Sequence, residues 1–346
     1  MRSFLWILIL SVVSCKTSQD SSDKRLGRDQ SGQNLYVKDV SGGDDLVCTA
    51  RLYRPKTELN NGLPIFYFQL GTGDYTVNKM LFDNLFGAKI SEHVNLLIID
   101  KPGLIYIEDS ADELKYNVKG CKKGNKVYEC PDSEGYKAYI KHTTGTLIDC
   151  GYQALKWASD IDKGSRYILA GQSEGSAIMG HLAGKLLSDD ETGNLIEVIY
   201  HHGSPMGKVF DDDEKFDCFD TETNNKLMVQ NSFSCGWARY TASLPLLPEV
   251  FFKLLDEQPK AESLKMEFIQ GLNDMVGTEH VLNFEDMNEQ RAESGKRYFR
   301  SISFAYHNPG LTEDNERGDG HALNKAFSKL FIKSLIHHIP ALKDND

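Results

Sequence analysis

The chain has 346 residues, of which 40% are hydrophobic and 26% charged, and its formal net charge at pH 7 is −11. That length is enough for one large hydrophobic core or two modest ones. The acidic charge and the lack of a basic stripe with interleaved aromatic residues argue against the nucleic-acid-binding class, so we expect no nucleic-acid partner.

Residues 1–14 predict a signal peptide, because Arg2 is followed by an apolar run over residues 4–13 that is too short to span a bilayer comfortably. The run ends in Val-Val-Ser-Cys, which resembles the lipobox of bacterial lipoproteins. This resemblance implies cleavage before Cys15, lipid modification of that cysteine, and a membrane-anchored protein of the bacterial cell envelope. A plain secretory signal and a secreted protein are the alternative. The polar residues 15–34 predict a flexible tether.

Six cysteines follow Cys15, and an even number in an exported protein permits disulfides. Sequence alone does not decide among the 15 possible pairings of six cysteines. The simplest pairs are the local ones, Cys121 with Cys130 and Cys218 with Cys235. A zinc site is not expected, because no Cys-x-x-Cys spacing is present.

The first half of the chain predicts strands separated by one helix. Residues 35–55 have a strand pattern, in which 46–53 alternate as an edge hairpin strand should. Residues 63–70 and 94–100 are nearly continuous apolar runs, as expected of central strands covered on both faces. Between them, residues 79–86 predict a helix.

An irregular insertion then precedes the centre of the chain. Residues 104–138 contain Cys121 and Cys130, and we interpret them as an excursion from the core in the form of a disulfide-pinned hairpin. Apolar residues at helical spacing predict a helix over residues 139–160. Residues 166–170 predict a short buried strand.

The second half continues the alternation of strands and helices. Strands are predicted over residues 194–201, 266–270 and 297–304, and a closing helix over 322–339. We therefore expect one α/β domain over residues 35–345, with a mostly parallel sheet covered by helices on both faces. Binding sites in such sheets lie at the carboxyl ends of the strands.

A G-x-S-x-G motif stands between a predicted strand and a predicted helix, with Ser173 at its centre. An abrupt strand-to-helix turn strains the central residue, and Gly171 and Gly175 allow the two elements to approach each other closely. The backbone N–H of Glu174 faces the same point. We predict Ser173 as a nucleophile, which requires a base and an orienting acid. The alternative is a glycine-rich turn with an ordinary surface serine.

Asp274 and His321 are the predicted partners of Ser173. Asp274 follows the strand at 266–270, and all three residues lie in connections that follow predicted strands, so they share one edge of the sheet. His307, just after the last strand, is the rival base. His201 and His202 end a strand near the same edge, and we interpret both as structural histidines.

The chain resembles the α/β-hydrolases, a superfamily of esterases, lipases, thioesterases and related serine hydrolases. The resemblance rests on the sequence order Ser173, Asp274, His321 and on the predicted strand or helix beside each residue. The resemblance covers about residues 45–340. It favours His321 over His307, because the family's base usually stands in such a Gly-His segment before the last helix.

The resemblance implies a serine hydrolase that cleaves carboxylic esters or thioesters through an acyl-enzyme on Ser173. His321 would be the base and Asp274 the orienting acid. Such a reaction requires no metal or organic cofactor, and the partner would be a small ester or lipid-like substrate. A serine aminopeptidase or peptidase of the same fold and a non-catalytic binding protein are the alternatives. The acyl group, the alcohol and the oligomeric state stay open.

The family also implies an oxyanion hole with two backbone donors. One would be the amide of Glu174, and the other that of Thr72, in the loop after the first central strand. Family members often have His-Gly where this chain has Leu70-Gly71. A backbone donor requires no particular side chain, so we still assign the second donor to the amide of Thr72.

Residues 204–265 form a second insertion, which we predict as a lid over the nucleophile. It is rich in apolar side chains, more than a chain segment leaves in water. These are Phe210, Phe216, Phe219, Phe233, Trp237 and Leu244 to Leu247. A bridge between Cys218 and Cys235 would restrain the segment. The alternative is a surface subdomain packed away from the site.

Overall fold

The computed structural model describes the short segment 24–28 and most of the chain from residue 34 onward. The described ranges are 24–28, 34–55, 62–71, 77–106, 116–121, 130, 132–189, 191–204, 245–271, 278–307 and 325–345. Within these ranges no helix is both long and apolar enough to cross a membrane.

One large sheet has the order β1-β2-β3-β5-β4-β8-β9-β10-β11. Its strands are β1 Lys24–Arg28, β2 Asn34–Ser41, β3 Val47–Arg54, β4 Ile65–Gln69, β5 Asn95–Asp100, β8 Tyr167–Gln172, β9 Ile196–His202, β10 Lys265–Gly271 and β11 Ser301–His307. The pairs β1–β2, β2–β3 and β3–β5 are antiparallel, whereas every pair from β5 to β11 is parallel. The predicted, mostly parallel sheet is therefore confirmed.

The central strands follow from their apolar sequences. Every side chain of β4 and β5 is buried, as the continuous apolar runs predict for strands covered on both faces. The prediction of β3 as an edge strand is wrong, because β3 pairs with β2 on one side and with β5 on the other. Its alternation holds only at its start, and its last five side chains, from Ala50 to Arg54, are all buried.

The edge beyond β2 is formed by β1, which lies inside the segment predicted as a tether. β1 pairs antiparallel with β2, from Lys24 opposite Val37 to Arg28 opposite Asn34. Strand structure therefore starts within residues 15–34, upstream of the predicted start of the domain.

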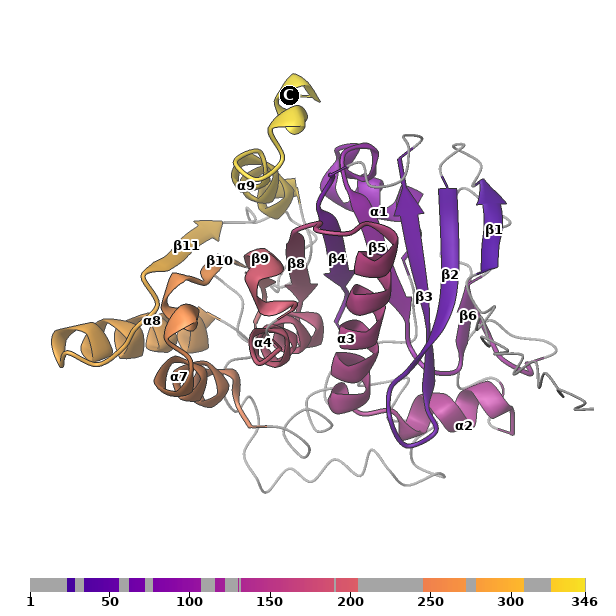
Figure 1. Cartoon of the computed structure of the whole chain (residues 1–346), viewed down its shortest axis with the longest axis horizontal. Helices are drawn as coiled ribbons and strands as arrows, with labels where there is room; N and C mark the ends of the chain where they lie inside the picture. Colours follow the sequence, from indigo (N-terminus) through magenta and orange to yellow (C-terminus); the bar gives the residue numbers. More distant parts are fainter. Residues whose placement is uncertain are drawn as a thin grey trace, which may run out of the picture.

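Helices cover both faces of the sheet (Figure 1). The helices are α1 Lys79–Phe86, α2 Glu134–Lys141, α3 Thr144–Ile161, α4 Glu174–Leu187, α7 Leu247–Glu257, α8 Thr278–Glu293 and α9 Lys325–Leu335, with short 3-10 turns at η1 Ile90–Glu92, η3 Gly193–Leu195, η4 Pro259–Ser263 and η5 Pro340–Asn345. Side chains of α3, α4, α7 and α8 share the larger core with one face of the sheet. Those of α1 and α9 form a second core with the other face.

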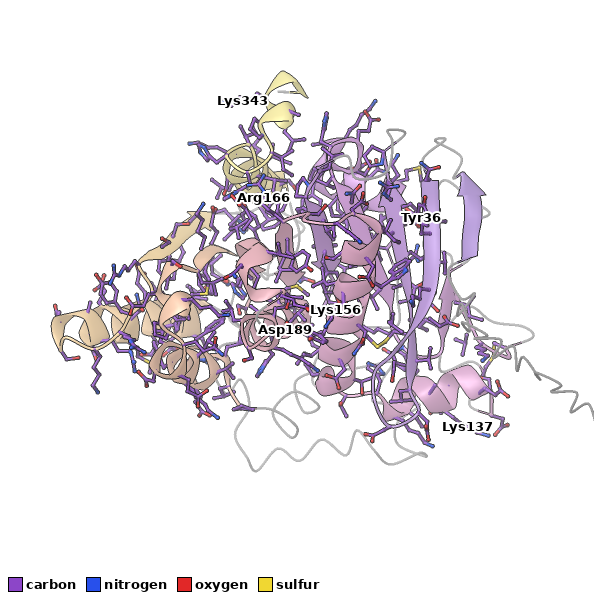
Figure 2. The ribbon with its side chains drawn as sticks, viewed as in Figure 1. Tyr36, Lys137, Lys156, Arg166, Asp189 and Lys343 are labelled. Carbon is purple, nitrogen blue, oxygen red and sulfur yellow. A yellow bond between two sulfur atoms is a disulfide. The ribbon has the colours of Figure 1, made fainter. Side chains whose placement is uncertain are left out.

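The helix predicted over residues 139–160 is two helices, α2 and α3. The chain breaks at Thr143, an extended residue whose hydroxyl caps α3 through a capping box with Thr146. The second half of α3 is tied to the chain just after α4 by Asp189, which accepts hydrogen bonds from Tyr152 and from Lys156 (Figure 2).

The first insertion is a small module in its own right. β6 Leu104–Tyr106 pairs antiparallel with β7 Tyr116–Val118, and α2 packs on them around Leu104, Val118, Tyr136 and Tyr139. The predicted disulfide between Cys121 and Cys130 is present. We call β6, β7 and α2, residues 104–141, the disulfide module.

A second disulfide was not expected. It joins Cys48 of β3 to Cys150 of α3, which are 102 residues apart in sequence. Both side chains are fully buried in the larger core. The bond therefore links the antiparallel half of the sheet to the helix layer.

The predicted lid is only partly described. Residues 245–265 contain α7 and η4, and α7 packs against α4 with Leu247 and Phe251 in the larger core. Leu246, the residue before α7, packs against the same core. This part of the insertion belongs to the helix layer on the sheet, and the lid interpretation does not hold for it. Residues 205–244, with Cys218, Cys235 and Trp237, lie outside the described ranges.

Candidate active site

Ser173 stands at the turn from β8 into α4, as the motif predicts. Its backbone lies in a region that L-residues rarely adopt, with φ 56° and ψ −125°. The N–H of Ser173 donates to the carbonyl of His202 at 2.9 Å, and its own carbonyl accepts from the N–H of Ser176 at 2.8 Å. These bonds hold the strained turn at the carboxyl end of a central strand.

The glycines of the motif permit the contact between β8, α4 and β4. A Cβ atom on Gly171 would lie 2.2 Å from the carbonyl oxygen of Gly175. A Cβ atom on Gly175 would lie 2.1 Å from the carbonyl oxygen of Gln69, at the end of β4. Only glycine fits at these two positions, so the motif is a packing requirement of the turn.

The chain segment after β4 reaches Ser173 directly. A Cβ atom on Gly71 would lie 2.7 Å from the Cβ of Ser173, so only a residue without a side chain fits there. Gly71 precedes Thr72, one of the two predicted oxyanion donors. The other, Glu174, is the first residue of α4, where a backbone N–H has no intrahelical acceptor and the helix end favours negative charge.

A buried ion pair that sequence reasoning missed lies beside the turn. The carboxylate of Glu174 is buried and accepts a hydrogen bond from the hydroxyl of Thr144 at 3.1 Å. The ammonium of Lys101 lies 3.8 Å from the other carboxylate oxygen and donates to the carbonyl of Gly71 at 2.8 Å. The signal in the sequence was Lys101 itself, a charged residue directly after the buried strand β5.

His201 has the surroundings of a structural histidine. Its Nδ1 and the hydroxyl of Ser176 form a 2.8 Å hydrogen bond, and its ring stacks on Phe268 at 4.7 Å between centroids. Burial lowers the pKa of His201 to about 3, so the ring is neutral at physiological pH.

His202 and His307 lie near one another at the carboxyl ends of β9 and β11. The Nδ1–H of His202 donates to the carbonyl of Ile269 at 2.7 Å, and its ring centroid is 5.7 Å from that of His307. His202 also borders a small, mainly apolar cavity on the face of the sheet that α1 and α9 cover. Its other lining residues include Phe68, Gln172, Tyr200 and Phe327.

The remaining predicted site residues lie outside the described ranges. These are Thr72, Asp274, His321 and Cys15, together with Cys218 and Cys235. The elements that flank Asp274 and His321 are described: β10 ends at Gly271, which is opposite His307 of β11, and α9 begins at Lys325. Among the described residues, no group of three His, Cys, Asp or Glu side chains could hold a metal ion.

Comparison with known proteins gives a likeness of fold. No family model and no curated protein matches the sequence. Est1E from Butyrivibrio proteoclasticus has a similar structure, with a TM-score of 0.50 and 11% identity over 89% of this chain and 99% of that one. A puromycin-hydrolysing peptidase of Mycobacterium tuberculosis gives a TM-score of 0.50 and 12% identity over 89% of this chain, which spans 40% of the peptidase.

Acetyl xylan esterase 1 from a Thermoanaerobacterium species gives a TM-score of 0.49 and 12% identity over 91% of this chain and 86% of that one. At these identities the similarity concerns the fold. The chain has the α/β-hydrolase fold, and Ser173 lies at the carboxyl end of its central strand β8.

Proposed function

We propose that the protein is a serine hydrolase that cleaves carboxylic esters or thioesters, with Ser173 as its nucleophile. The observation that carries this proposal is the geometry of the turn: a serine with φ 56° between β8 and α4, beside Gly71 and at the amino end of a helix. A strained backbone at a strand's carboxyl end is what a nucleophile requires and what a structural serine does not.

In the proposed reaction, His321 takes the proton of the Ser173 hydroxyl as the oxygen attacks the carbonyl carbon of the substrate. Asp274 accepts a hydrogen bond from the imidazole and stabilises its charged form. The amides of Glu174 and Thr72 bind the oxyanion. His321 then protonates the leaving alcohol or thiol, and water releases the acyl group by the same steps.

The described flanks support the choice of Asp274 and His321. Asp274 follows the end of β10 by three residues, and β10 is two strands from β8 in the sheet. His321 precedes α9 by four residues. His307, the rival base, is a buried residue at the end of β11 whose ring is 6.3 Å from that of Phe327, as in a packed interior.

The proposal includes export by the signal peptide and anchoring in the cell envelope by a lipid on Cys15. The disulfides Cys48–Cys150 and Cys121–Cys130 support it, because such bonds persist mainly in oxidising compartments. Mass analysis of the mature amino terminus tests the anchor: an acylated Cys15 supports it, and an unmodified terminus indicates a plain secretory signal.

Labelling with a fluorophosphonate tests the nucleophile without knowledge of the substrate. The probe forms a bond to an activated serine, so wild-type protein and Ser176→Ala should be labelled and Ser173→Ala should not. Ser176 is a matched control because it is also a buried serine and lies only three residues after Ser173, in α4. A protein that is not labelled at all would be a binding protein with a hydrolase fold.

Rates on paired substrates then distinguish the two hydrolase classes. A serine peptidase hydrolyses aminoacyl and peptide amides at a substantial rate and cleaves the corresponding esters as well, whereas an esterase cleaves esters and leaves the amides almost intact. Substantial turnover of peptide substrates would therefore overturn the ester assignment and leave Ser173 as the nucleophile of a peptidase.

A further inference from the structure

We propose that Lys101 is a positioning residue for the oxyanion hole, because its ammonium joins the two chain segments that supply the backbone donors. One segment is the loop that starts at Gly71, and the other is the amino end of α4 at Glu174. The inference rests on the proposed function, and it assigns a role to a side chain that does not itself touch the reacting atoms.

The first contact fixes a peptide plane. The ammonium of Lys101 donates to the carbonyl oxygen of Gly71 at 2.8 Å. In a trans peptide the C=O and the following N–H point in opposite directions. A carbonyl held by Lys101 therefore restrains the peptide plane that follows Gly71, and the proposed donor of the loop belongs to that plane.

The second contact fixes the start of α4. The carboxylate of Glu174 is held from two sides, by the hydroxyl of Thr144 at 3.1 Å and by the ammonium of Lys101 at 3.8 Å. The backbone N–H of the same residue is the second proposed donor. Restraint of the side chain at the first helical residue restrains the peptide from which this N–H projects.

The energetics of burial favour a positioning role over a stabilising one. The side chains of Lys101 and Glu174 are 3% and 4% exposed, and a buried ion pair often adds no net stability over apolar residues of the same volume. Two other ion pairs in the described chain are as deeply buried, Arg51–Asp100 and Arg54–Asp162, and both are close, two-pronged arginine–carboxylate contacts.

The Lys101 pair differs from those two in geometry. Its ammonium donates a hydrogen bond to a backbone carbonyl and lies 3.8 Å from the carboxylate, which is an ion-pair distance and too long for a hydrogen bond. A lysine ammonium has three donors that can point to separate partners, whereas an arginine fork suits one carboxylate. A lysine is therefore the suitable residue for bridging two chain segments.

The test compares Lys101→Met with wild-type protein in ester hydrolysis. Methionine keeps an unbranched side chain and removes the donors. We expect kcat to fall about 10- to 100-fold while KM stays within about twofold, since a misplaced oxyanion donor affects the transition state more than the bound substrate. Affinity for a boronic acid that forms a tetrahedral adduct on Ser173 should fall by a similar factor.

The matched control is Arg54→Met, which breaks an equally buried ion pair between β3 and Asp162, the residue after α3. It should lower the melting temperature and leave kcat unchanged where the protein is folded. If Lys101→Met does not fold, the double variant Lys101→Met, Glu174→Gln removes both buried charges and should show the same loss of kcat.

Two outcomes separate this inference from the proposed function. A folded Lys101→Met or double variant with wild-type kcat and wild-type boronic acid affinity overturns the positioning role. Wild-type protein that neither hydrolyses esters nor reacts with the fluorophosphonate at Ser173 overturns the proposed function instead.

Discussion

Ser173 combines a proposed chemical role with a conformational cost. A non-glycine residue at φ 56° and ψ −125° is strained by about 1–3 kcal/mol. Alanine keeps the Cβ atom and hence the strain, whereas glycine removes it. The variants Ser173→Ala and Ser173→Gly, both expected to be inactive, should therefore differ in stability.

We predict that Ser173→Ala and Ser173→Gly both lose hydrolysis, at least about a thousandfold in kcat. Ser173→Gly should also be more stable than Ser173→Ala, on the order of 1 kcal/mol after the entropy of the unfolded glycine is subtracted. Chemical denaturation of the two variants measures the difference. Equal stabilities would show that the turn is not strained, and residual turnover in either variant would count against the nucleophile.

His201 gives a second prediction at the scale of one residue. Burial lowers its pKa to about 3 from 6.5, so the unfolded chain binds a proton below pH 6.5 that the folded protein does not. Stability is therefore lost as the pH falls from about 6.5 towards 3. At pH 4 this amounts to about 3 kcal/mol relative to pH 7.

His201→Asn should lower stability at pH 7 and flatten its decline towards pH 4, because no imidazole is left to protonate. Urea denaturation at a series of pH values gives both the stability at pH 7 and its decline towards pH 4. An unchanged slope in the variant would mean that other groups cause the acid sensitivity. One of these is His181, whose pKa burial lowers to about 4.

At the scale of elements, the two disulfides should contribute unequally. In the chain-entropy model a bond that closes a longer loop restricts the unfolded chain more. The Cys48–Cys150 loop spans 102 residues and the Cys121–Cys130 loop 9.

Replacing both cysteines of a pair by alanine should cost about 4–5 kcal/mol for Cys48–Cys150 and about 2–3 kcal/mol for Cys121–Cys130. Thermal unfolding of the two double variants tests the order. The reverse order would indicate that packing of the disulfide module, and not loop length, decides the contributions.

His338 ties the end of the α9 region to the starts of β9 and β10. Burial lowers its pKa, but hydrogen bonds to Glu267 and Glu197 and the charges of these carboxylates outweigh that effect, so the pKa is raised above 6.5. A raised pKa stabilises the fold fully below pH 6.5, and this contribution is lost as the pH rises through the folded value.

His338→Gln should therefore destabilise the protein more at pH 5.5 than at pH 9. The neighbouring exposed His337→Gln serves as the control and should have little effect at either pH. Melting curves at the two pH values give the comparison. A loss of equal size at both would mean that the ring contributes by packing against Tyr200 and not by charge.

The sequence predicted elements best where burial is complete. β4 and β5 are apolar throughout because both faces are covered, so their type and place were evident. β3 was less evident, since its exposed start alternates like an edge strand. The break between α2 and α3 depends on the cap at Thr143, which apolar spacing does not reveal.

At the scale of the molecule, the candidate site was predictable only in part. A local motif located Ser173 and Glu174, because the turn itself demands that spacing of glycines. The partners of Glu174 come from Lys101, after β5, and Thr144, at the start of α3. In the sequence the disulfide module separates Lys101 from Thr144, and only the folded chain brings both to Glu174. No local sequence pattern encodes such a contact.

The bond between Cys48 and Cys150 has a consequence for proteolysis. Any cut in the backbone between these residues, for instance after the exposed Lys119 in the disulfide module, leaves two fragments that remain covalently joined. A nicked molecule should therefore migrate as one species in a denaturing gel and separate only after reduction. In any compartment that contains proteases, a cleaved molecule of this kind would keep its two pieces together.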